Sequence, residues 1–144
     1  MNKKDMYLWE KGWLSKFDRT ILTRKNSMNE IGSHGYAHER VVFEICHKLR
    51  KHGLREWISI DICKQPNPTM DVLFIDSSGK YLKGGCDFYT EVRSVDRKFR
   101  ADIVAMTYPT PTIIEVADSE SDESLEKKRK YWTGEGFEFV VVRV

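Results

Sequence analysis

The sequence predicts an α/β fold, in which a central mixed β-sheet is flanked by helices. Two short apolar runs, at 100–106 and 112–116, are followed by a charged segment with helical signals at 123–132 and by a last apolar run at 137–144. Apolar runs of this length are typical of strands buried in a sheet. A second observation is the amphipathic segment at 35–52, whose length and periodicity indicate a helix. The order strand, strand, helix, strand indicates mixed pairing.

Residues 1–33 are predicted to form a helical and loop extension before the main domain at 34–144. Trp9, Trp13 and Phe17 are spaced four residues apart, which places them in one stripe of a short amphipathic helix. Such a stripe is typical of a helix that packs on a protein core. The alternative is an aromatic and basic face that contacts nucleic acid.

The segment at 35–52 has the clearest helical pattern in the chain. Its apolar positions include Val42, Ile45 and Leu49, which fall on one face of a helix. Basic side chains crowd its last turns, where the helix dipole favours positive charge. Gly53 follows as a suitable C-terminal stop.

Strand signals follow this helix. Residues 57–63 alternate between apolar and polar side chains, and a proline-containing break at 65–68 separates them from a second run at 70–75. A turn sequence at 76–79 comes next, and the pattern at 87–92 indicates another strand. We therefore expect strands at all three of these runs.

The composition is that of a soluble globular protein with a highly charged surface. Hydrophobic residues make up 40% and charged residues 32% of the 144 positions, and the formal net charge is only +2. This length suits one domain with a hydrophobic core. Residues 1–60 are more basic, with twelve Lys and Arg against seven Asp and Glu, an excess that is compatible with phosphate binding.

The cysteine pattern favours a reduced, intracellular protein. Cys46, Cys63 and Cys86 are widely spaced and form no CxxC pair. The sequence contains no apolar run long enough to span a membrane and no signal-peptide pattern at its amino terminus. We therefore expect a cytoplasmic protein without a membrane partner. It has neither a GxGxxG nor a P-loop motif, which gives nucleotide-cofactor chemistry no support.

Two acids stand within the apolar runs near the carboxyl end. Asp102 lies at the start of one run, in the sequence Arg-Ala-Asp-Ile-Val, and Glu115 lies near the end of the next, in Ile-Ile-Glu-Val-Ala. Burying an ionised carboxylate is costly unless a cation or a set of hydrogen-bond donors meets it. Two such acids on adjacent strands can hold Mg²⁺ through hard oxygen ligands. The pair therefore predicts a metal site.

With this pair placed between the predicted helices, the chain resembles the PD-(D/E)XK nuclease superfamily. The resemblance covers roughly residues 35–144. The segments at 99–104 and 114–119 are most similar to the competence-associated, CoiA-like branch, and resolvase-like members are also similar. The resemblance implies a restriction-endonuclease-like core, with a helix, a β-meander that carries the metal-binding acids, a second helix and a final strand.

The resemblance also implies a deoxyribonuclease that uses Mg²⁺ or Mn²⁺. Asp102, Glu115 and the main-chain carbonyl of Val116 would hold the metal. A metal held in this way lowers the pKa of a bound water and stabilises charge that develops on the phosphate. Glu39 on the first helix and Glu91 upstream of Asp102 correspond to supplementary acids.

Each supplementary acid has an ordinary structural alternative. Glu39 could be a solvent-exposed side chain, and Glu91 could be the ion-pair partner of Arg93 or Arg100. DNA is the partner that the resemblance implies. A homodimer follows only by analogy, because cutting two strands requires two active sites.

The chain departs from the family pattern at Ala117, where a lysine is expected two residues after Glu115. Another lysine could reach the acids from the following helix, which carries Lys127, Lys128 and Lys130, and we expect Lys127 to fill this role. The alternative is that these lysines form a solvated charged face. The departure therefore leaves a second function open, a degenerate nuclease fold that binds nucleic acid or a protein partner without cleavage.

Two histidines, His34 and His38, are four residues apart and could ligate zinc from one face of a helix. The sequence offers them no convincing third ligand and no HExxH motif. A position for His38 near the active-site acids, in contact with phosphate or a carboxylate, is the stronger interpretation.

Overall fold

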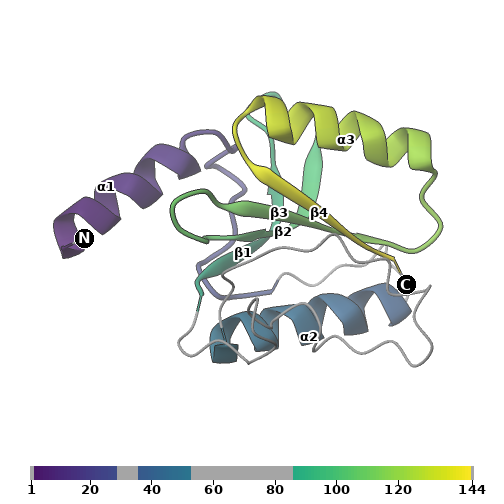
Figure 1. Cartoon of the computed structure of the whole chain (residues 1–144), viewed down its shortest axis with the longest axis horizontal. Coiled ribbons are helices and arrows are strands. Elements are labelled where there is room, and N and C mark those ends of the chain that lie inside the picture. Colours follow the sequence, from purple (N-terminus) through teal and green to yellow (C-terminus); the bar gives the residue numbers. More distant parts are fainter. Residues whose placement is uncertain (1, 29–35, 53–85, 144) are drawn as a thin grey trace.

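The computed structural model describes residues 2–28, 36–52 and 86–143. Within these residues the chain forms a four-stranded mixed sheet with helices on both faces (Figure 1). The helices are α1 (Lys3–Leu14), α2 (Tyr36–His52) and α3 (Asp122–Gly134), and the strands are β1 (Phe88–Arg93), β2 (Arg100–Ala105), β3 (Thr112–Ala117) and β4 (Glu138–Arg143). Because α3 covers one face and α2 covers the other, the predicted α/β class is confirmed.

The strand order in the sheet is β1-β2-β3-β4. The pairs β1–β2 and β2–β3 are antiparallel, whereas β3 and β4 are parallel and are connected through α3. Antiparallel neighbours can follow a short turn, but parallel neighbours need a crossover, and a helix is the usual one. The mixed pairing predicted from the order strand, strand, helix, strand is therefore confirmed.

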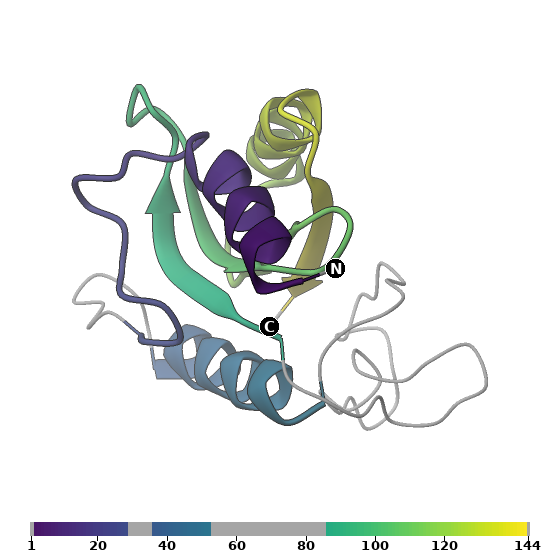
Figure 2. The same cartoon turned by 90° about the vertical axis from the view of Figure 1, so that its left-hand side faces the viewer.

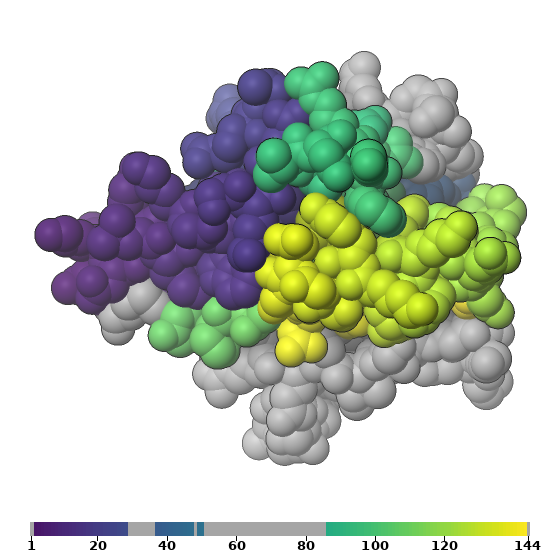
Figure 3. Space-filling view, turned by 90° about the horizontal axis from the view of Figure 1, so that it is seen from above, coloured from purple at the N-terminus to yellow at the C-terminus, as the bar shows by residue number. Residues whose placement is uncertain are grey.

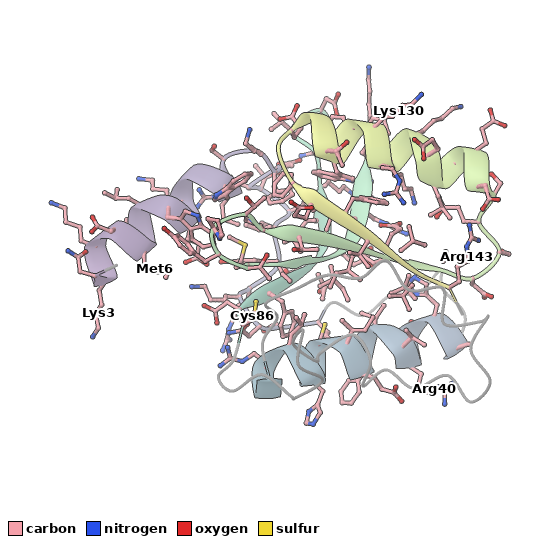
Figure 4. All side chains as sticks on the ribbon, viewed as in Figure 1. Lys3, Met6, Arg40, Cys86, Lys130 and Arg143 are labelled. Atoms are coloured by element: carbon pink, nitrogen blue, oxygen red, sulfur yellow. The ribbon has the colours of Figure 1, made fainter. Side chains whose placement is uncertain are left out.

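The helix α2 agrees with the helix predicted at 35–52. Val42, Ile45 and Leu49 are fully buried, and they belong to a core cluster that includes apolar side chains of β2 and β3. Arg40 points away from the sheet in Figure 4. The apolar stripe read from the sequence is thus the face that packs on the sheet.

Local sequence determines where α3 begins and how the chain leaves it. Ser121 is the N-cap, and its side-chain oxygen accepts the N–H of Ser124 at 3.2 Å. Asp122 and Glu123 lie in the first turn, where the helix dipole favours negative charge. Beyond the helix, Gly136 has a φ of +97°, a conformation that glycine adopts without strain, and the chain turns into β4.

The aromatic stripe of the extension packs on the protein core, as its spacing predicts. The ring of Trp13 lies 5.0 Å from that of Phe137, and Phe17 is only 2% exposed. Phe17 lies beyond the end of α1, however, because its backbone forms an isolated β-bridge with Ser94. The predicted stripe is therefore continued by extended chain rather than by helix.

The amino-terminal half of α1 extends away from this contact. Trp9 donates a hydrogen bond from Nε1 to the carbonyl of Pro109 at 2.9 Å, and its ring lies 5.5 Å from that of Tyr108. From Lys3 to Leu8, the residues of the helix are exposed. Figure 2 shows α1 lying in front of the sheet, and Figure 3 shows it extending past one end of the molecule.

Several expected features lie outside the described residues. These are the strands at 57–63 and 70–75, the break at 65–68, the turn at 76–79, Gly53, Cys63 and His34. In the described part of the chain, no helix is both long and apolar enough to cross a membrane.

Candidate active site

Asp102 and Glu115 lie where β2 and β3 part. The pairing of these strands includes Ile103 with Ile114, so the same register places Asp102 opposite Glu115. At this point the backbone N–H groups are bound by side chains, because the two carboxylates accept hydrogen bonds that the opposite strand would otherwise accept. The N–H of Val116 donates to Asp102 Oδ2 at 2.8 Å, and the N–H of Asp102 donates to Glu115 Oε2 at 3.4 Å. The two carboxylates therefore lie between the separating strands.

Both carboxylates are buried, with Asp102 only 2% and Glu115 only 3% exposed. Burial of two like charges side by side is unfavourable unless nearby cations or donors compensate. The flanking helices supply two such groups, Lys128 from α3 and His38 from α2, whereas the neighbouring strand β1 adds a third acid, Glu91.

Lys128 is the cation supplied by α3. Its Nζ lies 2.7 Å from Glu115 Oε1 and donates a hydrogen bond to it. Lys127, which we expect in this role from the sequence, is exposed, and the contact with Glu115 is made by the next residue. The reason is helical phase, because Lys128 is three residues after the buried Leu125 and four before the buried Trp132.

That spacing was a signal available in the sequence. A lysine on the same stripe as two large apolar residues faces the sheet, whereas its neighbour is turned by about 100°. Lys130, the third candidate, is exposed and points away from the sheet in Figure 4.

Glu120 is a site residue that the sequence analysis missed. Its Oε1 lies 2.7 Å from Lys128 Nζ and also accepts a hydrogen bond from Ser124 Oγ at 2.7 Å. Lys128 thus lies between a buried carboxylate, that of Glu115, and a more exposed one, that of Glu120. Nothing in the acidic segment at 118–122 marks Glu120, because its role depends on how the chain enters α3.

His38 is the group supplied by α2. It is 3% exposed, and its Nε2 lies 3.3 Å from Asp102 Oδ2, so the predicted contact of His38 with a carboxylate is confirmed. Burial lowers the pKa of His38, but the hydrogen bond and charge of Asp102 outweigh burial and raise the pKa above its ordinary value. Among the described residues, no group of three or more His, Cys, Asp and Glu side chains is arranged to hold a metal.

Glu91 is the acid contributed by β1. The register of β1 and β2 places it opposite Asp102, and its φ of +51° is unusual for a residue other than glycine. Its Oε2 lies 3.2 Å from Arg100 Nε, so the ion pair with Arg100 that we considered is present. Burial raises the pKa of Glu91, the Arg100 charge opposes that rise, and the Asp102 charge adds to it.

Glu39, the other expected supplementary acid, is partly exposed on α2. It follows His38 directly, so it is turned by about 100° around the helix from the residue that meets Asp102. Within the described residues, no contact joins Glu39 to Asp102 or Glu115. The structure therefore brings His38 to the acids from this helix in place of Glu39.

Burial and the neighbouring Asp102 both disfavour the charged form of Glu115. Burial raises the pKa of Glu115 to about 8, the Asp102 charge adds to the rise, and the Lys128 charge opposes it. Burial lowers the pKa of Lys128, but Glu115 and Glu120 more than offset this effect and raise it. At neutral pH, Glu115 therefore carries its proton more often than an exposed glutamate would.

Two of these groups carry oxygen atoms of the kind that a divalent cation prefers. Asp102 and Glu115 offer hard carboxylate oxygens, and the ammonium of Lys128 already supplies one positive charge at Glu115. Val116, the expected third ligand, touches the pair through its N–H. Ala117 is buried and pairs with Arg143 of β4, and the ammonium that contacts Glu115 comes from Lys128 of α3.

The two cysteines within the described residues are unsuited to a nucleophilic role. Cys46 and Cys86 are free and buried, and both belong to the core cluster between α2 and the sheet. Burial raises the pKa of each thiol to about 12, so the reactive thiolate is scarce at neutral pH.

Fold and site together define an α/β protein with a buried carboxylate pair, a lysine from the crossover helix at one acid and a histidine from the opposite helix at the other. No family model, curated protein or solved structure matches the chain.

Proposed function

We propose that the protein is a metal-dependent nuclease of the PD-(D/E)XK type, with a restriction-endonuclease-like core, that hydrolyses DNA phosphodiester bonds. One observation carries the proposal. Lys128 Nζ lies 2.7 Å from Glu115, so α3 supplies the ammonium that the strand position Ala117 lacks. Two strand acids and one lysine are the groups that this chemistry requires.

The fold supports the same function. A helix precedes an antiparallel meander, and a second helix then leads to a strand parallel to β3. This is the order of elements that the resemblance implies. Asp102 and Glu115 lie on the two middle strands of the sheet, where both flanking helices can reach them.

The roles of the side chains follow from their contacts. Asp102, Glu115 and the carbonyl of Val116 would hold Mg²⁺ or Mn²⁺, which supplies a Lewis acid and a water of lowered pKa when bound. Lys128 neutralises charge beside Glu115 and can donate a hydrogen bond to an oxygen of the phosphate or of the attacking water. His38 holds Asp102 through its Nε2.

A cleavage assay tests the proposal directly. Supercoiled and branched DNA are incubated with the protein in Mg²⁺, Mn²⁺ or EDTA, beside Asp102→Asn and Glu115→Gln. These substitutions keep side-chain size while removing the charges that would hold the metal. The expected result is cutting that needs metal and is lost in both variants. Cutting that persists in both variants would rule out this site.

A second function is favoured by one observation. Both carboxylates are almost fully buried, and the ammonium of Lys128 already neutralises one of them. A degenerate nuclease fold that binds DNA or a protein partner would need no more than this. DNA binding without metal-dependent cutting in the same assay would establish the second function in place of the first.

DNA is the proposed partner in either case. A homodimer would give the nuclease two active sites for the two strands of a duplex. Sedimentation of the protein with and without a DNA duplex distinguishes a dimer from a monomer.

A further inference from the structure

Lys128 is in contact with two carboxylates at once. Its Nζ lies 2.7 Å from Glu115 Oε1 and 2.7 Å from Glu120 Oε1. The two acids differ in burial, since the side chain of Glu115 is 4% exposed and that of Glu120 is 24% exposed. Ser124 Oγ donates to Glu120 Oε1 at 2.7 Å and so holds this acid beside Lys128.

A divalent cation and this ammonium would compete for Glu115. Mg²⁺ binds carboxylate oxygens at about 2.0–2.1 Å, and an ammonium at hydrogen-bond distance from the same oxygen would repel it. Metal binding at Asp102 and Glu115 therefore requires Lys128 to give up its contact with Glu115. Its contact with Glu120 already exists, so the ammonium has a partner to retain.

We propose that Lys128 is a built-in competitor of the divalent cation at Glu115, and that Glu120 is the carboxylate that receives its ammonium when the metal binds. This inference rests on the metal site of the proposed function. It assigns to Glu120 a positioning role, because Glu120 acts on the metal site through Lys128.

The proposal gives two substitutions opposite effects on metal affinity. Lys128→Met removes the competing charge, so it should bind Mn²⁺ more tightly. Glu120→Gln removes the receiving carboxylate, so Lys128 should stay on Glu115 and Mn²⁺ should bind more weakly. A general weakening of the fold would lower affinity in both variants.

The test is calorimetric titration of the full chain with Mn²⁺ at one fixed pH. The expected changes are about tenfold tighter binding for Lys128→Met and about fivefold weaker binding for Glu120→Gln, within the usual range of coupling between two binding events. Lys127→Met and Glu126→Gln are matched controls, because both residues are exposed on the same helix. Thermal melting without metal checks that each variant is folded.

A double variant separates competition from simple charge effects. If Glu120 acts through Lys128, Glu120→Gln should change Mn²⁺ affinity less than twofold once Lys128→Met is present. Equal effects of Glu120→Gln in both backgrounds would overturn the receiving role of Glu120. Unchanged or weaker Mn²⁺ binding in Lys128→Met would overturn the competition.

The outcomes distinguish this inference from the proposed function. Tighter Mn²⁺ binding in Lys128→Met, with no DNA cutting by the native protein, would support the inference and reject the nuclease. Metal-dependent cutting by the native protein, without tighter binding in Lys128→Met, would reject the inference alone. Absence of Mn²⁺ binding in every variant would reject both.

Discussion

The carboxylate of Asp102 accepts a hydrogen bond from the backbone N–H of Val116, with 2.8 Å between Oδ2 and N, at the point where β2 and β3 separate. A side chain thus satisfies a main-chain donor that a continuous ladder would pair with a carbonyl. The acid is therefore part of the sheet as well as part of the site, and stability and chemistry are coupled at this residue.

Substitution of Asp102 separates these two roles. Asp102→Ala leaves the buried N–H of Val116 without this acceptor and should lower the free energy of unfolding by about 1–3 kcal/mol. Asp102→Asn keeps an acceptor oxygen and removes the charge next to Glu115, so it should cost less. Urea unfolding followed by tryptophan fluorescence measures both. Equal losses in the two variants would show that the hydrogen bond contributes little.

Glu115 should make stability depend on pH. Burial raises its pKa in the folded protein to about 8, above the ordinary value of 4.5, so the folded state binds the proton more tightly than the unfolded state. The stabilisation from the proton is complete below about pH 4.5 and is lost as pH rises towards 8. Glu115→Gln lacks this loss, so its stability relative to the native protein should rise with pH.

Urea unfolding at pH 5 and pH 8 measures this difference. Other titrating groups, such as His38, contribute similarly to both proteins and largely cancel in the comparison. Glu123→Gln, an exposed residue on α3, is the control and should show no such trend. A relative stability of Glu115→Gln that falls with rising pH would contradict the raised pKa.

Phe17 should couple the amino-terminal extension to the main core. The ring is buried and lies 5.6 Å from Trp132 and 5.3 Å from Phe137. Phe17→Ala should therefore cost about 3–5 kcal/mol of unfolding free energy. Tyr7→Ala, at a position that is 61% exposed, should change stability by less than about 0.5 kcal/mol. A Phe17→Ala protein as stable as the native one would contradict this coupling.

Much of the described fold could be predicted from periodicity and punctuation. The apolar stripe of Val42, Ile45 and Leu49 identified α2, and short apolar runs identified β2, β3 and β4. These patterns work because each element buries one side against the sheet. The continuation of the stripe to Phe17 as helix was wrong, because a tertiary bridge with Ser94 decides the backbone there.

The sequence predicted the acids of the candidate site that interrupt buried apolar runs. It did not predict the contacts that depend on how a helix or a loop is placed. Charged residues within apolar runs identified Asp102 and Glu115, which the register brings opposite each other. The choice of Lys128 over Lys127 depends on the rotation of α3, which the spacing of Lys128 from Leu125 and Trp132 indicates but a list of basic residues alone does not. Glu120 depends on a loop conformation, and no periodic pattern encodes it.

Lys128 should be essential for cleavage while opposing metal binding. Lys128→Met removes a cation that can stabilise charge on the phosphate, and loss of one such donor typically lowers kcat by about 10²–10³-fold. The same variant is expected to bind Mn²⁺ more tightly, so saturation with metal should not restore the rate. Lys127→Met, one residue away and exposed, should cut DNA at a rate close to that of the native protein.

Single-turnover cleavage at saturating Mn²⁺ measures the effect of Lys128 without the difference in metal affinity. Lys128→Arg is an informative third variant, because it keeps the positive charge but changes its shape and hydrogen-bond geometry. Partial activity in Lys128→Arg would indicate that charge neutralisation is the main contribution of the lysine. A full rate in Lys128→Met would instead remove the lysine from the reaction, because its ammonium at 2.7 Å from Glu115 would then serve only to balance a buried charge.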